Sequence, residues 1–233
     1  MSKNIAIIPA RGGSKRIPRK NIKNFLGKPI IAYPIEILKR SNLFDEIIVS
    51  TDDEEIAKIA IEYGAKVPFL RSNKNSDDFA TTADVLLEVI EKLEENGQVF
   101  DNAICVYPCS PFLTEDLLIE SFKKIENSKL DCVFPIVKYG HPIQRALKVT
   151  NELIAPYFEE NNSVRTQDLT AAFHDAGMFY TFNIKTFKIT KSLRTKNTLG
   201  IEIEEHLTQD IDNIIDWKLA ELKYKMFFLN EEL

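Results

Sequence analysis

Four short apolar runs constrain the fold of this chain more than any other feature of its sequence. Continuous apolar runs of this length are typical of strands in a parallel sheet whose two faces are both covered. The runs are Ile5–Ile8, Ile47–Val49, Ala103–Tyr107 and Cys132–Val137. The first run predicts an opening strand over Asn4–Pro9.

Segments with a helical pattern lie between these runs. Ile30–Lys39 has apolar residues at helical spacing, and Asp52 or Asp53 can cap a helix that ends at Tyr63, before Gly64. Two further helices are predicted, from Thr81 to Leu93 and over Glu115–Ile125 with Thr114 as its cap. This alternation predicts an α/β fold with a mostly parallel sheet and helices on both faces. Ligands of such sheets bind beyond the carboxyl ends of the strands.

The pattern changes after the fourth run. Residues 138–170, which we call the lobe, show no helical pattern, and a segment this long is usually a functional loop, an arm or an oligomerisation element. An apolar run returns at Met178–Phe182, and a last helix is predicted over Ile211–Phe227, introduced by Thr208–Asp210. Because no linker or repeat interrupts the chain, we expect a single domain over residues 1–233.

Composition and charge exclude several classes of protein. The chain has 44% hydrophobic and 28% charged residues, which is ordinary for a globular protein. Its net charge of −5 argues against nucleic acid and anionic membranes as partners. No apolar run reaches the about 20 residues that a membrane-spanning helix needs. The 3 cysteines cannot form a disulfide framework, so a cytoplasmic location is expected.

The segment that says most about function directly follows the first predicted strand. Between Arg11 and Lys20 it holds 5 cations, and it contains the adjacent pair Gly12 and Gly13. Glycines let backbone N–H groups approach a ligand closely, and cations at this density suit a polyphosphate. The segment matches neither the Walker A nor the dinucleotide-binding pattern. The alternative is a solvated basic loop.

Two carboxylates, Asp210 and Asp212, precede the last predicted helix. Residues two apart in an extended segment share a face, so both carboxylates can meet one divalent cation such as Mg²⁺. An N-cap and a first-turn acid would explain the same two residues without a metal, and the residues alone favour that explanation.

The remaining candidates divide into binding and packing residues. Arg145, Arg165 and His174 lie in or near the lobe and either bind an acidic substrate or are surface charges. Cys105 lies within an apolar run, and Trp217 has helical spacing from Ile214, so both are expected in the core.

Taken together, these segments resemble a known family. Residues 7–21 match the acylneuraminate cytidylyltransferase signature, Ala-Arg-x-x-Ser-Lys-x-x-Pro-x-Lys-Asn, at every fixed position. The resemblance continues in chain order through five further segments, which are Val49–Asp52, Leu70–Arg71, Tyr107–Leu113, Ala172–Tyr180 and Asp210–Asp212. It implies a Rossmann-like nucleotide-diphospho-sugar transferase fold, a homodimer, Mg²⁺ dependence, and CTP and an acidic nine-carbon sugar as substrates.

The resemblance also implies a role for each matching residue. Asp210 and Asp212 match the metal pair, which reverses the preference for a helix cap, and the lobe resembles the dimerisation lobe of the family. The matching nucleotide-binding positions are Ala10, Arg11, Gly12, Ser14, Lys20, Asn21 and Arg71, with Arg11, Lys15 and Asp212 as catalytic residues. The expected sugar-binding residues are Tyr107, Gln144, Arg145, Arg165, His174 and Tyr180.

Departures from the sialic acid pattern point to one branch of the family. Sialic acid members usually have Gln-Pro-Thr-Ser-Pro where this chain has Tyr107–Pro111, and Arg-Pro-Asn-Gly where it has His174–Gly177. These segments, with His141–Leu147, resemble the pseudaminic acid branch. The expected reaction is therefore activation of pseudaminic acid with CTP to give a CMP-sugar for glycan biosynthesis. The alternatives are N-acetylneuraminate as the sugar, or a non-catalytic nucleotide-binding regulator.

Overall fold

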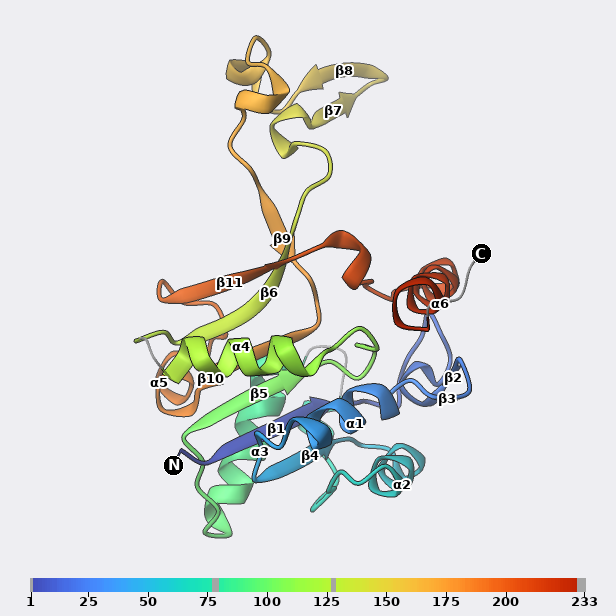
Figure 1. Cartoon of the computed structure of the whole chain (residues 1–233), viewed down its shortest axis with the longest axis vertical. Coiled ribbons are helices and arrows are strands. Elements are labelled where there is room, and N and C mark those ends of the chain that lie inside the picture. The colour runs from blue at the N-terminus through green and yellow to red at the C-terminus, as the bar shows by residue number, and fades with distance from the viewer. Residues whose placement is uncertain (1, 77–79, 127–128, 230–233) are drawn as a thin grey trace.

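A twisted central sheet with a projecting lobe organises the molecule (Figure 1). The computed structural model describes residues 2–76, 80–126 and 129–229. Within these residues, seven strands form the sheet in the order β11-β6-β10-β5-β1-β4, and β9 also pairs with β6. Their bounds are β1 Asn4–Pro9, β4 Glu46–Ser50, β5 Asn102–Val106, β6 Cys132–Lys138, β9 Phe173–Asp175, β10 Phe179–Asn183 and β11 Thr198–Ile203.

The sheet is mostly parallel, as the sequence predicts. β1 runs parallel to β4 and β5, and β11 runs parallel to β6, whereas β9 and β10 are antiparallel to their neighbours. All four apolar runs and the later run at Met178–Phe182 form strands at the expected places. The strands β9 and β11 were not among the predicted elements.

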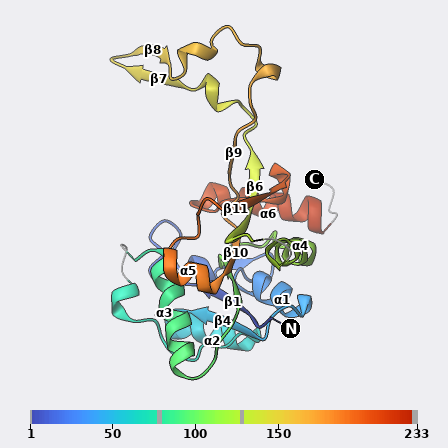
Figure 2. The ribbon, with the colours of Figure 1, turned by 90° about the vertical axis from the view of Figure 1, so that its left-hand side faces the viewer.

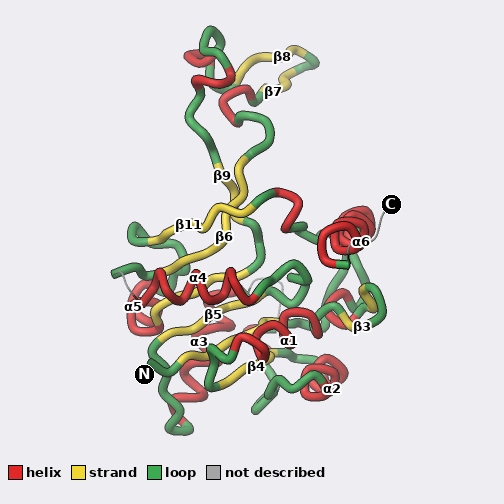
Figure 3. Tube along the Cα trace, viewed as in Figure 1, coloured by secondary structure: helices red, strands yellow, loops and turns green. Residues whose placement is uncertain are grey.

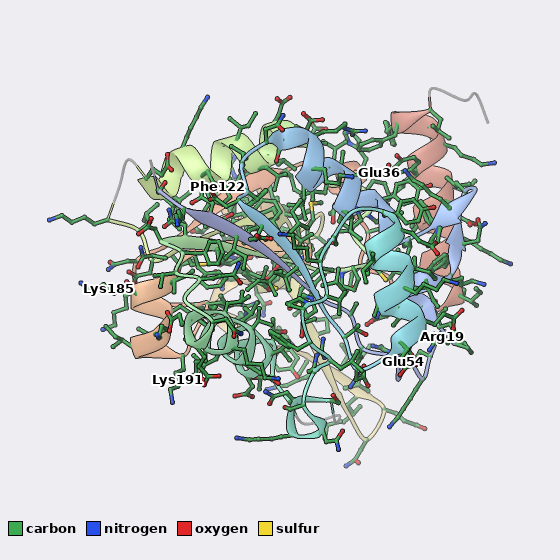
Figure 4. The ribbon with its side chains drawn as sticks, turned by 90° about the horizontal axis from the view of Figure 1, so that it is seen from below. Arg19, Glu36, Glu54, Phe122, Lys185 and Lys191 are labelled. Atoms are coloured by element: carbon green, nitrogen blue, oxygen red, sulfur yellow. The ribbon has the colours of Figure 1, made fainter. Side chains whose placement is uncertain are left out.

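Helices cover both faces of this sheet. Alternate residues of β1 enter different cores, with Ala6 and Ile8 on one face and Ile5 and Ile7 on the other. The helices are α1 Ala32–Ser41, α2 Glu54–Glu62, α3 Thr82–Glu95, α4 Glu115–Glu126, α5 Ile184–Thr190 and α6 Ile214–Phe228. Phe122 of α4 lies on the opposite side of the sheet from Lys185 of α5 (Figure 4).

Capping side chains fix where the helices begin, and they correct the predicted start of the last helix. Asp53 accepts hydrogen bonds from the backbone N–H groups of Glu55 and Ile56, and Thr81 forms a capping box with Asp84. The last helix was expected to begin at Ile211 but begins at Ile214, because Asn213 provides its cap. Asp210 and Asp212 therefore precede the helix and do not cap it.

The lobe stands away from the body on β6 and β9 (Figures 1 and 2). It was expected to be irregular, yet it contains a hairpin of β7 Leu147–Thr150 and β8 Leu153–Pro156. The connecting residues Asn151 and Glu152 both have positive φ, 50° and 66°, as a tight two-residue hairpin turn requires.

Short elements complete the chain (Figure 3). A small hairpin of β2 Asn24–Phe25 and β3 Lys28–Pro29 packs beside α6, where Phe25 meets Trp217 edge to face. The 3₁₀ turns are η1 Lys20–Ile22, η2 Asn73–Asn75, η3 Ile143–Arg145, η4 Glu159–Asn161, η5 Thr166–Asp168 and η6 Glu205–Leu207. Trp217 and Cys105 are buried in the core, as predicted. Among the described residues, no helix combines the length and apolarity that crossing a membrane requires.

Candidate active site

A cavity of about 490 Å³ opens where β1 and β5 end, at the carboxyl edge of the parallel strands. Its walls come from the basic segment after β1, from the start of α3, from the turn after β5 and from the approach to α6. The predicted site residues that line it are Arg11, Ser14, Lys15, Lys20, Asn21, Arg71, Tyr107 and Asp212. Segments far apart in sequence therefore converge at the edge where ligands of α/β sheets bind.

The basic segment is fixed by the acidic turn after β4. The backbone N–H of Gly12 donates to Asp52 Oδ1 at 2.9 Å. A Cβ atom on Gly12 would lie 2.7 Å from Asp53 Oδ2, whereas one on Gly13 would meet no atom within 4 Å. Glycine is thus required at position 12 because the backbone there passes too close to Asp53, the cap of α2, for a Cβ atom to fit. This contact explains the glycine, since Gly12 is not among the residues that line the cavity.

Arg19 ties the far end of the segment to the same turn. Its guanidinium donates to Asp53 at 2.5 and 2.9 Å and to Glu55 at 2.5 Å, and Arg19 itself has φ 54°. Arg19 projects beside α2, near Glu54 (Figure 4). The hydrogen bonds from Arg19 hold the pKa of Asp53 down at about 2. The side chain of Asn21 closes the segment by donating to the Arg11 carbonyl at 2.9 Å.

Arg71 is a buried cation in the wall of this cavity. Its side chain is 8% exposed, and its Nε donates to Ser50 Oγ at 3.1 Å, while a terminal nitrogen donates to the Ser50 carbonyl. Burial lowers the pKa of Arg71, and the nearby charges of Asp52 and Glu88 oppose that effect. A guanidinium held at the end of β4 in this way can donate to a polar edge of a ligand.

Glu88 of α3 orders the turn that carries Asn75 into the cavity wall. It accepts hydrogen bonds from the backbone N–H and the hydroxyl of Ser72, from Asn75 and from Lys92. Burial raises the pKa of Glu88, but these hydrogen bonds outweigh it and bring the pKa to about 2. Glu88 is therefore an ionised structural residue behind the site.

Of the two carboxylates before α6, Asp212 lines the cavity, whereas Asp210 is not among its lining residues. Asp212 Oδ1 accepts from Arg16 at 2.7 Å, and Lys20 Nζ donates to the Ile211 carbonyl, between the two aspartates, at 2.8 Å. The protein around Asp210 raises the pKa of its carboxyl, and the charge of Asp212 adds to this rise. The two carboxylates are like charges close together, with cations beside them. A bound divalent ion would stabilise such a pair.

The donor set fits a magnesium-type site that is completed by a substrate. In the ranges that the structure describes, no group of three or more His, Cys, Asp or Glu side chains is placed to hold a metal. Mg²⁺ commonly uses one or two carboxylates and takes its other ligands from water and phosphate oxygens. Asp210 and Asp212 supply that number of carboxylates, and the cavity beside them has room for a phosphate chain.

The expected sugar-binding residues divide into two groups in space. Tyr107 lines the cavity, and its hydroxyl lies 3.4 Å from Thr82 Oγ1. Tyr180 is only 6% exposed and lies behind Tyr107, with ring centroids 6.0 Å apart. His174 lies on β9 against Tyr139, outside the cavity wall.

The lobe projects away from the body of its own chain (Figure 2), and its residues Gln144, Arg145 and Arg165 are not among those that line the cavity. Gln144 donates to the Thr170 carbonyl at 2.8 Å, and Arg165 donates to Asp168 at 2.7 Å. Arg145 donates to the carbonyls of Asn162 and Val164, so its guanidinium holds the lobe together. These three side chains are therefore not brought to the site within one chain.

The structure also adds residues that the sequence did not reveal. Thr81, Thr82 and Ala80, at the start of α3, line the cavity together with Asn75. Thr81 was identified only as the start of a helix, and only the fold shows that this helix start lies in the same cavity wall as the basic segment. Ala10 has no exposed surface, and its backbone N–H donates to the Ser50 carbonyl at 2.9 Å, so it lies behind the cavity wall.

Comparison with known proteins decides the family. The family model described as "Cytidylyltransferase" matches residues 5–225. The chain belongs to this family. Cytidylyltransferases of this type generally use a divalent metal ion.

Curated relatives of this cytidylyltransferase cover nearly its whole length. A pseudaminic acid cytidylyltransferase from Campylobacter jejuni is 41% identical over 225 residues, which are 96% of this chain and 97% of the relative. A CMP-N,N'-diacetyllegionaminic acid synthase from Legionella pneumophila is 31% identical and covers 98% and 97% of the two chains. Among solved structures, a CMP:2-keto-3-deoxy-manno-octonic acid synthetase complexed with CTP matches with a TM-score of 0.70 and 18% identity, over 97% and 98% of the two chains. That match shows the fold.

Proposed function

We propose that this cytidylyltransferase transfers CMP from CTP to pseudaminic acid and releases pyrophosphate. The observation that carries the proposal is the convergence of a cation-rich glycine segment and Asp212 of the acid pair on one cavity at the carboxyl edge of the sheet. The choice of sugar is supported by the relatives at 41% and 40% identity, both of which are pseudaminic acid cytidylyltransferases from Campylobacter jejuni. Tyr107, in place of the Gln typical of sialic acid members, agrees with that choice.

The cations of the cavity serve the chemical step. The anomeric oxygen of the sugar forms a bond to the α-phosphorus of CTP, and the bond from that phosphorus to the β-phosphate bridging oxygen breaks. Negative charge grows on the departing pyrophosphate, so Arg11, Lys15 and Lys20 stabilise the transition state more than the ground state. Lys20 is held before the substrate arrives by its hydrogen bond to the Ile211 carbonyl, so its placement needs little reorganisation.

Mg²⁺ would be held by Asp210 and Asp212. When bound, it neutralises phosphate charge and helps to orient the triphosphate. Lys20, which donates to the carbonyl between the two aspartates, links this pair to the basic segment. Asp212 is the carboxylate that lines the cavity, and it is the one we assign to the catalytic centre.

Nucleotide binding uses the remaining residues of the segment. The hydroxyl of Ser14 lies in the cavity wall and is proposed to meet the phosphates. Ala10 and Gly12 support the segment from behind, since their backbone N–H groups donate to the Ser50 carbonyl and to Asp52. Asn21 and Arg71 are buried donors in the wall, and they suit the ribose and the base. The start of α3, with Ala80 and Thr82, closes the side of the cavity next to Arg71.

The lobe is proposed to bind a second copy of the chain. Its hairpin exposes a group of large apolar side chains, Leu147, Val149, Leu153, Ile154 and Tyr157, each more than half exposed. Monomers rarely leave such a patch uncovered. In a homodimer, the lobe would bring Gln144, Arg145 and Arg165 towards the partner's cavity, which explains why they lie outside the cavity of their own chain. His174 lies on β9, which carries the lobe. Val149→Glu should yield monomers by light scattering, while Lys148→Glu on the same strand should leave the dimer intact; a dimer in both would contradict this interface.

The function is tested by product analysis. The enzyme is incubated with Mg²⁺, pseudaminic acid and each of the four nucleoside triphosphates in turn. Pyrophosphate release with CTP, and a product with the mass of CMP-pseudaminic acid, are expected. Equal release with ATP or UTP, or binding of CTP without any CMP-sugar, would contradict the proposal.

A further inference from the structure

The chain between β11 and α6 is fastened to α6 shortly before it reaches the acid pair. We call residues 205–208 the approach segment. Lys223 Nζ donates to two carbonyl oxygens of this segment, that of Thr208 at 2.9 Å and that of Glu205 at 3.1 Å. One turn further along the same face of α6, the ring of Phe227 packs against that of His206, with centroids 4.3 Å apart. None of the roles assigned above uses Lys223.

The approach segment is also fastened to the sheet. Thr208 is only 8% exposed, and its hydroxyl donates to the Ala176 carbonyl at 3.2 Å. Ala176 is itself tied to β6, because its backbone N–H donates to the Pro135 carbonyl at 3.0 Å. Thr208 is therefore held at two atoms, by α6 through its carbonyl and by the sheet through its hydroxyl.

This anchoring fixes the backbone on one side of Asp210. Only Gln209 separates Thr208 from Asp210, so the two backbones lie within about 7 Å of each other. On the other side, Ile211 is 2% exposed in the hydrophobic core, and its carbonyl accepts from Lys20. Asp210 thus lies exposed between two fixed points of the chain, and a shift of either point would move its carboxylate.

The ammonium of Lys223 suits this anchoring task. Charge-assisted hydrogen bonds are stronger than neutral ones, and one ammonium can donate to several carbonyls at once. Burial lowers the pKa of Lys223, and the nearby charge of Glu205 opposes that effect. Part of the free energy of the two hydrogen bonds therefore offsets the cost of burying the charge. Lys223 is not among the residues that line the cavity, so its contacts serve the chain and not a ligand.

We propose that Lys223 is a positioning residue that fixes the approach segment and thereby sets where Asp210 presents its carboxylate to the metal ion. This inference rests on the proposed function and deepens it, since Lys223 acts through the acid pair. Residues that orient metal ligands typically change metal affinity by about ten- to a hundredfold when they are removed. Loss of Lys223 should therefore raise the Mg²⁺ requirement of the enzyme.

The first test measures the Mg²⁺ requirement of Lys223→Met, which keeps a long side chain but removes the donors. The free Mg²⁺ concentration that gives half the maximal rate at saturating CTP should rise by about tenfold. At saturating Mg²⁺, KM for pseudaminic acid should stay within about twofold of wild type. Lys223→Arg keeps a charged donor and should stay within about threefold of the wild-type Mg²⁺ requirement. Lys218→Met, exposed on the same helix, is the matched control and should leave that requirement unchanged.

Hydrogen exchange gives a second readout that does not depend on activity. The backbone N–H groups of Leu207 and Asp212 donate to the Glu204 carbonyl and to Asp216, so their exchange reports on this part of the chain. In protein without substrates or metal, a peptide covering residues 205–212 should exchange at least about fivefold faster in Lys223→Met, while peptides from β1 and β5 should exchange as in wild type. Thr208→Val removes the contact with the sheet and should reproduce both effects.

These two readouts separate positioning from a general loss of stability. A merely structural role would lower kcat equally at every Mg²⁺ concentration and would speed exchange in β1 and β5 as well. An unchanged Mg²⁺ requirement in Lys223→Met, or unchanged exchange over residues 205–212, would overturn the inference.

Asp210→Asn distinguishes failure of this inference from failure of the metal assignment. If Asp210→Asn raises the Mg²⁺ requirement and Lys223→Met does not, only the role of Lys223 is wrong. If neither variant raises it, the assignment of Asp210 to the metal is wrong, and the inference falls with it. The proposed reaction stands in both cases, since it fails only if wild type makes no CMP-pseudaminic acid.

Discussion

Arg19 and Asp53 form a two-point hydrogen-bonded pair, with nitrogen to oxygen distances of 2.5 and 2.9 Å. Asp53 also caps α2, so one carboxylate joins the end of the basic segment to the start of a helix. Cationic side chains that would meet a triphosphate repel one another before it binds. The pair with Asp53 offsets part of that repulsion and keeps the segment in place.

The Arg19–Asp53 pair predicts a specific acid dependence of stability. The folded pKa of Asp53 is about 2, below its value in an unfolded chain, so the pair stabilises the protein above about pH 4, and that stabilisation is lost as the pH falls towards 2. Asp53→Asn keeps a capping side chain but should remove about 1 kcal/mol at pH 7, allowing for the exposure of Arg19. Chemical denaturation at pH 7 and pH 3 checks this. Acidification protonates Asp53 in wild type, so the difference in unfolding free energy between wild type and Asp53→Asn should shrink. Glu88 titrates in the same range in both proteins, so its contribution cancels from this difference. A difference that stays constant would argue against the pair.

The adjacent glycines provide a matched pair of substitutions. Gly12→Ala places a Cβ 2.7 Å from Asp53 Oδ2 and should destabilise the fold by about 1–3 kcal/mol. Gly13→Ala meets open space and should leave stability within about 0.5 kcal/mol of wild type. Thermal unfolding without ligand measures both, and equal losses in the two variants would show that Gly12 is not held by close contact.

Neutralising either acid before α6 should reduce turnover without unfolding the protein. Asp210→Asn and Asp212→Asn lose charge that would hold Mg²⁺, which should cost about a hundredfold or more in kcat. Asp116→Asn, at the exposed start of α4, is the control and should remain near wild type. Rates are compared at limiting Mg²⁺; near-normal turnover in both variants would remove the pair from the mechanism.

Lys15 should serve mainly the chemical step, and Arg71 should serve mainly the binding of CTP. Lys15→Ala should chiefly lower kcat, because Lys15 meets charge that grows in the transition state. Arg71→Ala should chiefly raise KM for CTP, and it should also lower stability by about 1–3 kcal/mol, because the Ser50 carbonyl loses one of its two donors and the Ser50 hydroxyl loses its contact with Arg71. Steady-state kinetics with varied CTP separates the two. If both variants change only KM, Lys15 has no special role in the transition state.

The sequence predicted β1, β4, β5, β6 and β10, because their apolar runs reflect side chains that are buried against the helices. It missed β11, whose residues Thr198–Ile203 alternate between buried and exposed at the edge of the sheet, and the lobe hairpin, whose side chains are largely exposed. The hairpin turn at Asn151 and Glu152 lacks the glycine that usually signals such a turn. Exposed elements carry a weaker hydrophobic pattern, so their detection depended on tertiary structure.

For the site, the basic segment was predictable because its chemistry is local in sequence. Thr82 and Asn75 were not, because they reach the cavity only through the packing of α3 beside β1. For the acid pair, the resemblance favoured the metal role over a helix cap, and the structure assigns the cap to Asn213. The contacts of Lys223 with the Glu205 and Thr208 carbonyls join α6 to the approach segment, and no spacing in the sequence indicates them.

Competition between two sugars tests the central claim most directly. Equal concentrations of pseudaminic acid and N-acetylneuraminic acid are mixed with CTP, Mg²⁺ and a low concentration of enzyme, and the two CMP-sugars are quantified by mass spectrometry at early times. The product ratio equals the ratio of kcat/KM values. The account predicts at least about a hundredfold excess of CMP-pseudaminic acid, since ring stereochemistry and a buried, unpaired hydroxyl both oppose the sialic acid. Equal amounts of the two products, or an excess of CMP-N-acetylneuraminic acid, would contradict it.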